Sequence, residues 1–463
     1  MDPMHEPDRP PPGVTSDATE VVVVPATTDA AAPAAGDVAV PRDWVRNVVL
    51  FLGGQTVSLF GSMLVQYAVM WYLTLTTKEG TVLALATIFG FVPQAVISIF
   101  GGVWADRHNR KYLAMGADTA IAIATFGLAL VMISGTTNLW LIYAVMAVRS
   151  AGAGIQTPAV SALIPQIVPA NQLLRINGLN QSIQAGMMLL APALAALLYA
   201  NLEIGSILFI DVVTALIGVG LLALIPVPTL RRVAEDRPAY FADLAGGVRY
   251  ISGHRLVRWL LGLFFVVMVL AGAPGFLTPL MVARSFGEEM WKLTALEISF
   301  SVGMMIAGAT IGWWGQKTGR IRLLALSSVA FGLFTVGLGA SPTLWVFLTF
   351  MFLFGLAVPA FSTPSMTIFQ EIVPPERQGR VFGFVGIVSA VAMPLGMGVF
   401  GPIADVWSVQ VVLILAGGLT FLALAIAFLV PTGRWALAQA REAGSALGRG
   451  TAPDAGSLAP EAA

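Results

Sequence analysis

The stretch GGVWADRHNRK, residues 101–111, decides the fold once it is set beside a weaker copy, GWWGQKTGR, residues 312–320. One constant offset of nearly half the chain aligns Gly102 with Gly312, Asp106 with Gln316, Arg107 with Lys317 and Arg110 with Arg320. A long apolar segment lies on each side of both copies. A short charged loop held between apolar segments and repeated once per half predicts two related helical bundles in a membrane.

The composition of the chain agrees with a membrane protein. Hydrophobic residues make up 57% and charged residues 11% of the 463 residues, and the mean hydropathy is +0.82. About a quarter of the residues of a soluble domain are charged, so no water-soluble fold could hide this much apolar surface. The formal net charge is zero, which argues against a nucleic-acid partner. The three histidines are far apart and cysteine is absent, so we expect no metal site and no cofactor.

Windows of about twenty apolar residues, long enough to cross a bilayer, recur along the chain with short breaks. They predict an all-α polytopic membrane protein with twelve transmembrane helices, six on each side of a polar stretch. The expected spans are 47–74, 81–104, 112–134, 139–161, 172–199, 204–225, 257–283, 291–314, 321–340, 344–369, 379–402 and 408–430.

The same windows divide the chain into domains. Composition rich in Pro, Ala, Gly and small polar residues predicts that both ends of the chain are disordered. The expected domains are a disordered tail over 1–43, a six-helix bundle over 44–225, a cytoplasmic linker over 226–256, a second six-helix bundle over 257–430 and a disordered tail over 431–463.

The distribution of basic residues predicts the orientation in the membrane. Alternate loops hold Arg107, Arg110, Lys111, Arg175, Lys317, Arg320, Arg322, Arg377, Arg380 and the arginines between positions 231 and 258. The opposite loops hold only Lys78, Arg284 and Lys292. Because basic loops stay in the cytoplasm, we expect both termini and the middle loop to be cytoplasmic, in a multi-pass protein of the cell membrane.

A second repeat supports the division into two halves. PQIVPANQLLRINGL at residues 165–179 is similar to QEIVPPERQGRVFGF at residues 370–384, and a Thr-Pro pair precedes each copy, at Thr157 and Thr363. Two parallel copies of a six-helix unit predict halves related by an axis along the membrane normal.

These segments resemble the major facilitator superfamily. Gly102, Asp106, Arg107, Arg110 and Lys111 match its G-x-x-x-D-R-x-G-R-R/K loop between helices 2 and 3, with Asn109 where the family prefers glycine. More narrowly, segments such as GGQTVSLFGSMLVQYAVMWYLT, RSAGAGIQTPAVSALIP and VFGFVGIVSAVAMPLG are similar to the macrolide-efflux branch of drug exporters. The resemblance covers nearly all twelve expected helices.

The resemblance implies an exporter of bulky amphipathic compounds that is driven by protons, and it gives the loop a role. In the family, the aspartate equivalent to Asp106 holds the cytoplasmic side of the N-terminal half against helix 11, as a latch that favours the outward-facing state. Asp106 can accept charge-assisted hydrogen bonds that are made and broken as the halves rock. The alternative is a solvated basic loop without a mechanical role.

Away from the ends of the expected spans, four ionisable residues lie inside the bilayer, where each is expensive unless it is paired or lines a wet cavity. They are Asp118, Arg149, Asp211 and Glu297. Arg149, in an R-x-x-G arrangement, resembles the family's helix-4 motif, in which the arginine is linked to proton movement. As a fixed positive charge it would help an approaching carboxylate to release its proton. A purely structural arginine, bonded to backbone carbonyls, is the alternative.

Asp211 and Glu297 lie in helices of opposite halves. A carboxylate in apolar surroundings holds a proton more readily than one in water, so either residue could couple transport to protons or bind a basic substrate. A static hydrogen bond between helices is the alternative for both. Asp118 lies nearer the cytoplasm, and we expect it to pair with Arg107 or Arg110.

Uncharged polar side chains at helical spacing predict the wall of a substrate cavity. The candidates are Gln55, Ser62, Gln66, Gln156, Asn180 and Gln184. They could equally bind helices to one another. Pro and Gly predict hinges at Gly272, Pro274, Gly275 and Pro279, at Pro192, and at Pro394, Gly396 and Gly398.

Together these patterns predict a secondary transporter and not an enzyme. The chain has no GxxxxGK[ST] phosphate loop and no Ser-His-Asp set. We expect a monomer that binds amphipathic small molecules and protons within the lipid bilayer. The alternatives are export of a siderophore or another endogenous metabolite, import, and a transport-inactive receptor on the same scaffold.

Overall fold

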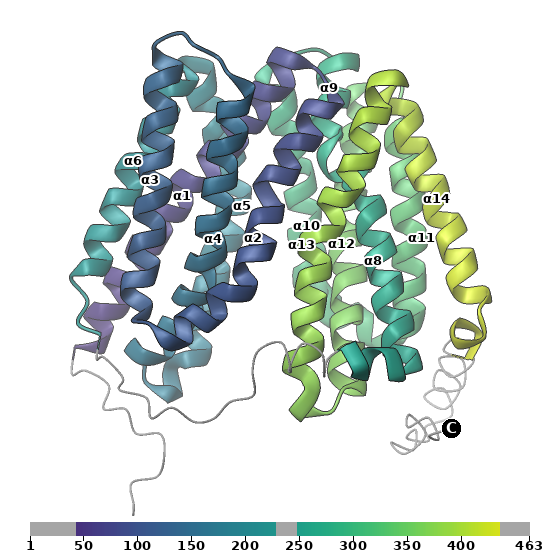
Figure 1. Ribbon diagram of the computed structural model, residues 1–463. Coiled ribbons are helices and arrows are strands. Elements are labelled where there is room, and N and C mark those ends of the chain that lie inside the picture. The colour runs from purple at the N-terminus through teal and green to yellow at the C-terminus, as the bar shows by residue number, and fades with distance from the viewer. Residues whose placement is uncertain (1–42, 228–247, 436–463) are drawn as a thin grey trace, which may run out of the picture. The chain divides into compact units, whose positions relative to one another are not determined.

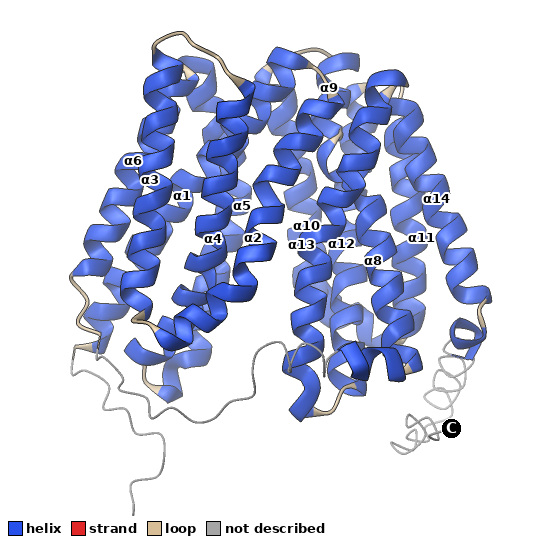
Figure 2. Ribbon diagram, in the orientation of Figure 1, coloured by secondary structure: helices blue, strands red, loops and turns tan. Residues whose placement is uncertain are grey.

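The computed structural model describes residues 43–227 and 248–435, and within these ranges it leaves out the side chains of 102, 103, 106, 107, 170, 314, 316, 317, 375, 376, 379 and 380. The described chain consists of helices and short loops, without a strand (Figure 2). Twelve helices are long and apolar enough to cross a membrane. The two tails and most of the linker that the sequence predicts lie outside the described residues. Residues 431–435, which belong to the second expected tail, are helical.

The helices follow the predicted order (Figure 1). We call the first six the N half: α1 (Trp44–Thr77), α2 (Gly80–Arg107), α3 (Arg110–Ile133), α4 (Leu139–Ile167), α5 (Leu173–Asn201) and α6 (Ile204–Ala223). The rest form the C half: α8 (Arg255–Phe276), α9 (Thr278–Ser285), α10 (Met290–Thr318), α11 (Arg320–Gly339), α12 (Leu344–Ile372), α13 (Pro375–Val406) and α14 (Val409–Leu429). A single 3-10 turn, Ala170–Gln172, precedes α5.

The packing of the helices repeats between the halves. In the N half α2 packs on α4, α1 on α6, α3 on α4 and α6, and α1 on α5. In the C half α10 packs on α12, α8 on α14, α11 on α12 and α14, and α8 on α13. Even the two main contacts between the halves, α2 with α13 and α5 with α10, correspond to each other. This one-to-one match confirms the two pseudo-symmetric six-helix bundles.

The two copies of the charged loop turn by different means. In the C half Gly319 has a φ of 76°, a conformation that favours glycine, and it separates α10 from α11. Asn109, at the equivalent place in the N half, has a φ of −67°, and its side chain accepts a hydrogen bond from the Lys111 amide at 3.0 Å. Asn109 therefore replaces the family's glycine by capping the start of α3.

The helix is interrupted at one of the places where proline and glycine predict hinges, and it is continuous at the other two. The helix that contains Pro274 breaks at Leu277, between α8 and α9, as the sequence predicts. By contrast α5 continues through Pro192, and α13 continues through Pro394. Gly396 serves a different purpose, because a Cβ atom there would overlap the carbonyl group of Val269 on α8. Close packing of α13 against α8 therefore requires glycine at this position.

We name the two ends of the bundle by residues that lie there. The Lys78 end holds the α1–α2, α3–α4, α5–α6, α9–α10 and α13–α14 connections, and the Arg110 end holds the α2–α3, α4–α5, α10–α11 and α12–α13 connections. Exposed tryptophans occur near both ends, Trp140 and Trp345 at the first and Trp313 at the second. Aromatic residues at these depths are typical of the two membrane–water interfaces.

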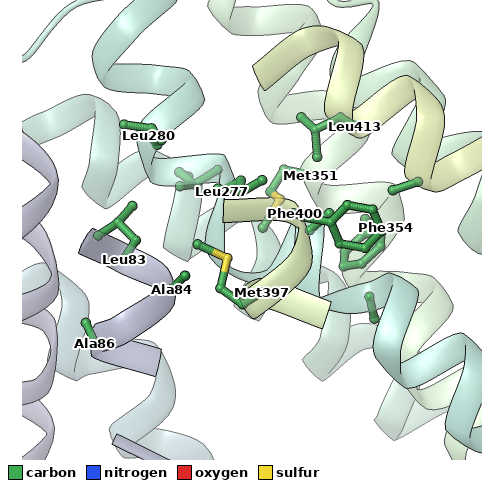
Figure 3. Packing of buried hydrophobic residues seen from close by; sticks show 14 of the residues in the cluster. Leu83, Ala84, Ala86, Leu277, Leu280, Met351, Phe354, Met397, Phe400 and Leu413 are labelled. Atoms are coloured by element: carbon green, nitrogen blue, oxygen red, sulfur yellow. The ribbon is translucent and has the colours of Figure 1, made fainter. Parts of the chain in front are cut away.

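The apolar core is shared between the halves at the Lys78 end. One cluster of buried residues joins Leu83 of α2 to Leu277, Leu280 and Met397 of the C half (Figure 3). Near the Arg110 end, buried residues from all six helices of the N half form a separate cluster that belongs to the N half alone. The halves are therefore sealed together at one end by packing that the described residues do not repeat at the other.

Candidate functional site

The centre of the N half is built on an ion pair between Arg149 of α4 and Asp211 of α6. The Asp211 side chain is only 1% exposed, so the pair is inside the protein. Arg149 also donates to the Thr125 hydroxyl of α3 at 2.5 Å, and Ser62 of α1 donates to Asp211 at 3.3 Å. Four helices thus meet at one ion pair, and its hydrogen bonds offset the large penalty of burying charges.

Small residues make this convergence possible. Gly61 of α1 lies beside α6, where a Cβ atom would overlap the Thr214 hydroxyl group. The absence of that atom lets α1 approach α6 closely enough for Ser62 to reach Asp211. Arg149 and Ser62 thus hold the Asp211 carboxylate inside the N half.

Asp118 of α3 lies next to this pair and not at the charged loop. Its side chain is buried, and its electrostatic neighbour is Asp211. The expected pairing with Arg110 is wrong, because Arg110 donates to the carbonyl groups of Ala105 and Ala162, at 3.1 and 2.7 Å. The side chain of Arg107, the other expected partner, is outside the described part of the chain. Among the described side chains, Asp118 has no hydrogen-bond or ion-pair partner.

Glu297 of α10 occupies a different environment. It is half-buried and interacts electrostatically with Tyr67 of α1, in the other half. One helical turn further, Ser301 donates to the Met188 carbonyl of α5 at 3.4 Å, again across the halves. Within the described residues Glu297 forms no ion pair and no side-chain hydrogen bond. The two carboxylates that the sequence treats alike are therefore distinct, since Asp211 is paired within one half and Glu297 faces the junction of the two.

The polar candidates for the cavity wall separate into two groups. Gln156 of α4 donates to Gln55 of α1 at 3.1 Å, and Ser62 binds Asp211, so these three side chains hold helices together. Gln66 and Gln184 are exposed and Asn180 of α5 is half-buried, and these three make no side-chain hydrogen bond with the described residues. The first group therefore joins helices, whereas the second group forms no such link among the described residues.

The structure describes only part of the proposed latch. The side chains of Gly102, Asp106 and Arg107 lie outside the described residues. Lys111 donates to the carbonyl groups of Ala223 and Ile225, at 2.7 and 2.8 Å. These carbonyls end α6, and Ala162, which accepts from Arg110, lies near the end of α4. The described bases of this loop therefore bind helix ends within the N half.

A polar cluster at the Lys78 end was missed by the sequence argument. Each of the three basic residues in these loops forms an ion pair. The pairs are Lys78 with Glu288, Arg284 with Asp405 and Lys292 with Glu289. The first of these pairs joins the two halves, and Asp405 also reaches the start of α2. The sequence pattern that could have predicted this cluster is the small number of basic residues in these loops, each of which has an acidic residue near the end of an expected span as a candidate partner.

A repeated bundle of membrane helices, with its ionisable side chains inside a half or at the junction of the halves, defines a transport protein of the membrane. The family model of the Major Facilitator Superfamily matches residues 50–310 and 290–450. The chain belongs to this superfamily of membrane transporters, which act on small molecules and are not enzymes.

Individual relatives agree with this assignment. The chain is 33% identical to macrolide efflux protein A of Streptococcus pyogenes over 359 residues, 77% of this chain and 89% of the relative. It is 25% identical to the enterobactin exporter EntS of Shigella boydii over 290 residues, 61% of this chain and 67% of the relative. The crystal structure of the nucleoside transporter NupG is similar in fold, with a TM-score of 0.65 at 15% identity, covering 83% of this chain and 98% of that one.

Proposed function

We infer that the protein exports amphipathic, macrolide-like compounds across the cell membrane in exchange for protons, by alternating access of one central site. The similarity to macrolide efflux protein A over most of both chains supports this class of substrate. The basic loops at the Arg110 end support a cytoplasmic location for that end and for both termini.

The observation that carries the exchange hypothesis is the contrast between Asp211 and Glu297. Asp211 is neutralised by Arg149 inside the N half. Glu297 is a half-buried acid without an ionic partner among the described residues, and it faces α1 across the junction of the halves. A carboxylate in that position can hold either a proton or a basic group of a substrate. Because one site cannot hold both, occupancy by one releases the other.

Asp118 has a second role in the same proposal. It is a buried acid that lies beside the Arg149–Asp211 pair without a bond of its own. Protonation of Asp118 removes its repulsion with Asp211, so the proton occupancy of Asp118 is coupled to the pair. We assign Glu297 to the substrate and proton exchange, and Asp118 with Arg149 and Asp211 to proton coupling in the N half.

Transport into inverted membrane vesicles tests the proposal. A pH gradient with the vesicle interior acidic should drive accumulation of a radiolabelled macrolide inside the vesicles. An uncoupler should abolish this accumulation. Glu297→Gln should lower the gradient-driven rate at least about tenfold, because glutamine can neither release a proton nor bind a basic group through a negative charge. Glu203→Gln, at the exposed start of α6, is the matched control and should leave the rate within about twofold. Unchanged transport by Glu297→Gln would remove this acid from the mechanism.

Export of a siderophore is the second candidate, because the enterobactin exporter EntS is also similar to the chain. A catecholate siderophore is anionic when deprotonated, so an exporter for it has no need of a cation-binding acid. Competition in the vesicle assay separates the two candidates. A catecholate siderophore that inhibits macrolide accumulation no more than an unrelated organic acid would leave the macrolide-like class as the substrate.

A further inference from the structure

Asp405, near the last turn of α13, is the centre of a polar cluster that joins the halves at the Lys78 end. Its two carboxylate oxygens accept hydrogen bonds from the amide groups of Gly80 and Thr81, at 2.5 and 2.8 Å. The Thr81 hydroxyl group adds a third bond at 2.6 Å. Gly80 and Thr81 begin α2, so a C-half carboxylate binds the otherwise unpaired amides at the start of an N-half helix.

Arg284, in the last turn of α9, binds the same carboxylate at 3.0 Å and links it to α1. Its Nε atom donates to the Lys78 carbonyl at 3.0 Å, and its Nη1 atom donates to the Ala404 carbonyl at 2.6 Å. Lys78 has a φ of 54°, the left-handed conformation that ends α1. This is a common way for a helix to end, and the Lys78 carbonyl of this turn accepts the hydrogen bond from Arg284.

The Lys78 side chain forms a further ion pair with Glu288, but this pair is peripheral. The two side chains are 42% and 56% exposed, compared with 28% for Arg284 and 24% for Asp405. Exposed ion pairs contribute little to stability, whereas the Asp405 contacts are partly shielded and include three bonds from one helix start. The strength of the cluster is therefore concentrated at Asp405 and Arg284.

An apolar layer lies directly beneath the cluster. It includes Leu83 and Ala84 of α2, Leu277 next to α9, and Met397 of α13, each of them buried (Figure 3). At this level the two backbones nearly touch, because a Cβ atom at Gly401 would lie 2.5 Å from the Gly80 carbonyl oxygen and 2.7 Å from Ala84 Cβ. Polar bonds at the rim and dry packing below them close the same end of the junction.

We propose that Asp405 and Arg284 form a latch that holds the N and C halves closed at the Lys78 end and that must open in each transport cycle. Opening separates Asp405 from the start of α2, and Arg284 from the Lys78 carbonyl. Both side chains already contact solvent, so water can replace the lost bonds. The latch is thus strong enough to favour the closed state and exposed enough to be reversible.

The latch lies at the opposite end from the loop around Asp106 and differs from it in construction. Arg110 and Lys111 bind helix ends within the N half. Asp405 instead binds from one half to the other. The inference concerns residues of the α1–α2 connection, α9 and α13 that the family's loop motif does not include.

The rate of thiol labelling at a buried position measures opening at this end. The natural chain has no cysteine, so Ala84→Cys introduces the sole thiol of the protein. Ala84 is 3% exposed and faces Gly401 across the junction, so a membrane-impermeant maleimide reaches it only when the halves part. Labelling is measured in right-side-out and inverted vesicles, and an exposed Thr136→Cys reference identifies the preparation that presents the Lys78 end.

We expect Asp405→Ala to speed labelling of Ala84→Cys at least about tenfold, and only from the Lys78 side, because it removes three bonds between the halves. Arg284→Gln should speed it about threefold or more. The matched control is Glu289→Gln, which removes a charge from the same end but breaks only the Glu289–Lys292 pair within the C half, and it should stay within about twofold.

Two outcomes would overturn the latch. One is an unchanged labelling rate in both Asp405→Ala and the conservative Asp405→Asn, each shown to be folded by a single symmetric elution peak and a cooperative unfolding transition. The other is an equal acceleration by Glu289→Gln. The measurement requires no transported compound, so its result is independent of what the protein exports.

Discussion

The Lys78 end and the Arg110 end of the molecule are held together in different ways. At the Lys78 end polar bonds run from one half to the other, as between Asp405 and the start of α2. At the Arg110 end the bonds from Arg110 to Ala162 and from Lys111 to Ala223 lie within the N half, and the Arg320–Glu371 pair lies within the C half. The apolar core shows the same difference, being shared at the first end and divided at the second.

The difference separates two kinds of contact. Contacts inside a half must survive when a transporter changes the side to which it opens, because the halves move largely as rigid bodies. Contacts between halves must break and re-form. Substitutions inside a half should therefore lower the stability of the protein without changing how readily a reagent reaches the junction of the halves. Substitutions at contacts between the halves should change that accessibility.

The largest loss of stability is expected from Asp211→Asn, which leaves Arg149 without its buried partner. Breaking one partner of a buried ion pair lowers the free energy of unfolding by about 3 to 5 kcal/mol. An unfolding titration in mixed detergent micelles measures it. The double variant Arg149→Met with Asp211→Leu should recover most of the loss while remaining transport-inactive. If the double variant is no more stable than Asp211→Asn, the loss of stability does not come from leaving Arg149 without its partner.

The next effect is expected from Gly401→Ala at the junction of the halves. The added methyl group would lie 2.5 Å from the Gly80 carbonyl oxygen, so α2 and α13 must separate. Such overpacking costs about 1 to 3 kcal/mol, and a cysteine at buried Ala404 should label correspondingly faster. Gly398→Ala on the same helix is the control, because its Cβ atom would meet Ile88 at an ordinary 3.5 Å. Equal labelling of both variants would show that the close approach does not seal this end.

A smaller effect is expected from Lys111→Met at the Arg110 end. The variant loses the two bonds to the end of α6, which should lower the free energy of unfolding by about 1 kcal/mol. Because these bonds lie within the N half, labelling of Ala84→Cys should stay within about twofold. A large change in that labelling rate would instead place Lys111 in the mechanical coupling of the halves.

The smallest effect is expected from Glu371→Gln, which breaks the exposed pair with Arg320. The two side chains are 37% and 54% exposed, and such pairs contribute less than about 1 kcal/mol. The midpoint of the unfolding titration should be close to that of the natural protein. A loss as large as that of Asp211→Asn would show that the Arg110 end of the C half depends on this pair.

Most of the fold could be predicted from the sequence, because its causes are local. An apolar run of about twenty residues becomes a membrane helix wherever it occurs in a chain, and the repeated loops identified the two halves. The break at Leu277 also followed from the glycines and prolines around it. Boundaries differed by only a few residues, since capping by side chains such as Asn109 extends or ends a helix locally.

The candidate site was predicted only as a set of residues. The sequence identified Asp118, Arg149, Asp211 and Glu297 because ionisable groups are rare in membrane helices. It could not say that Asp211 would meet Arg149 while Glu297 faced the other half. It also did not place Asp118 beside Asp211, because the rotation of α3 about its axis is decided by packing on α4 and α6.

By itself, the sequence determined the class of protein, the twelve spans and their division into halves, through hydrophobicity and internal repetition. Only the tertiary structure decided which charges are paired and which end of the junction is closed. The physical reason is distance along the chain. Asp405 and Gly80 lie in different halves, and nothing in either segment specifies the other until helix packing brings α13 against the start of α2.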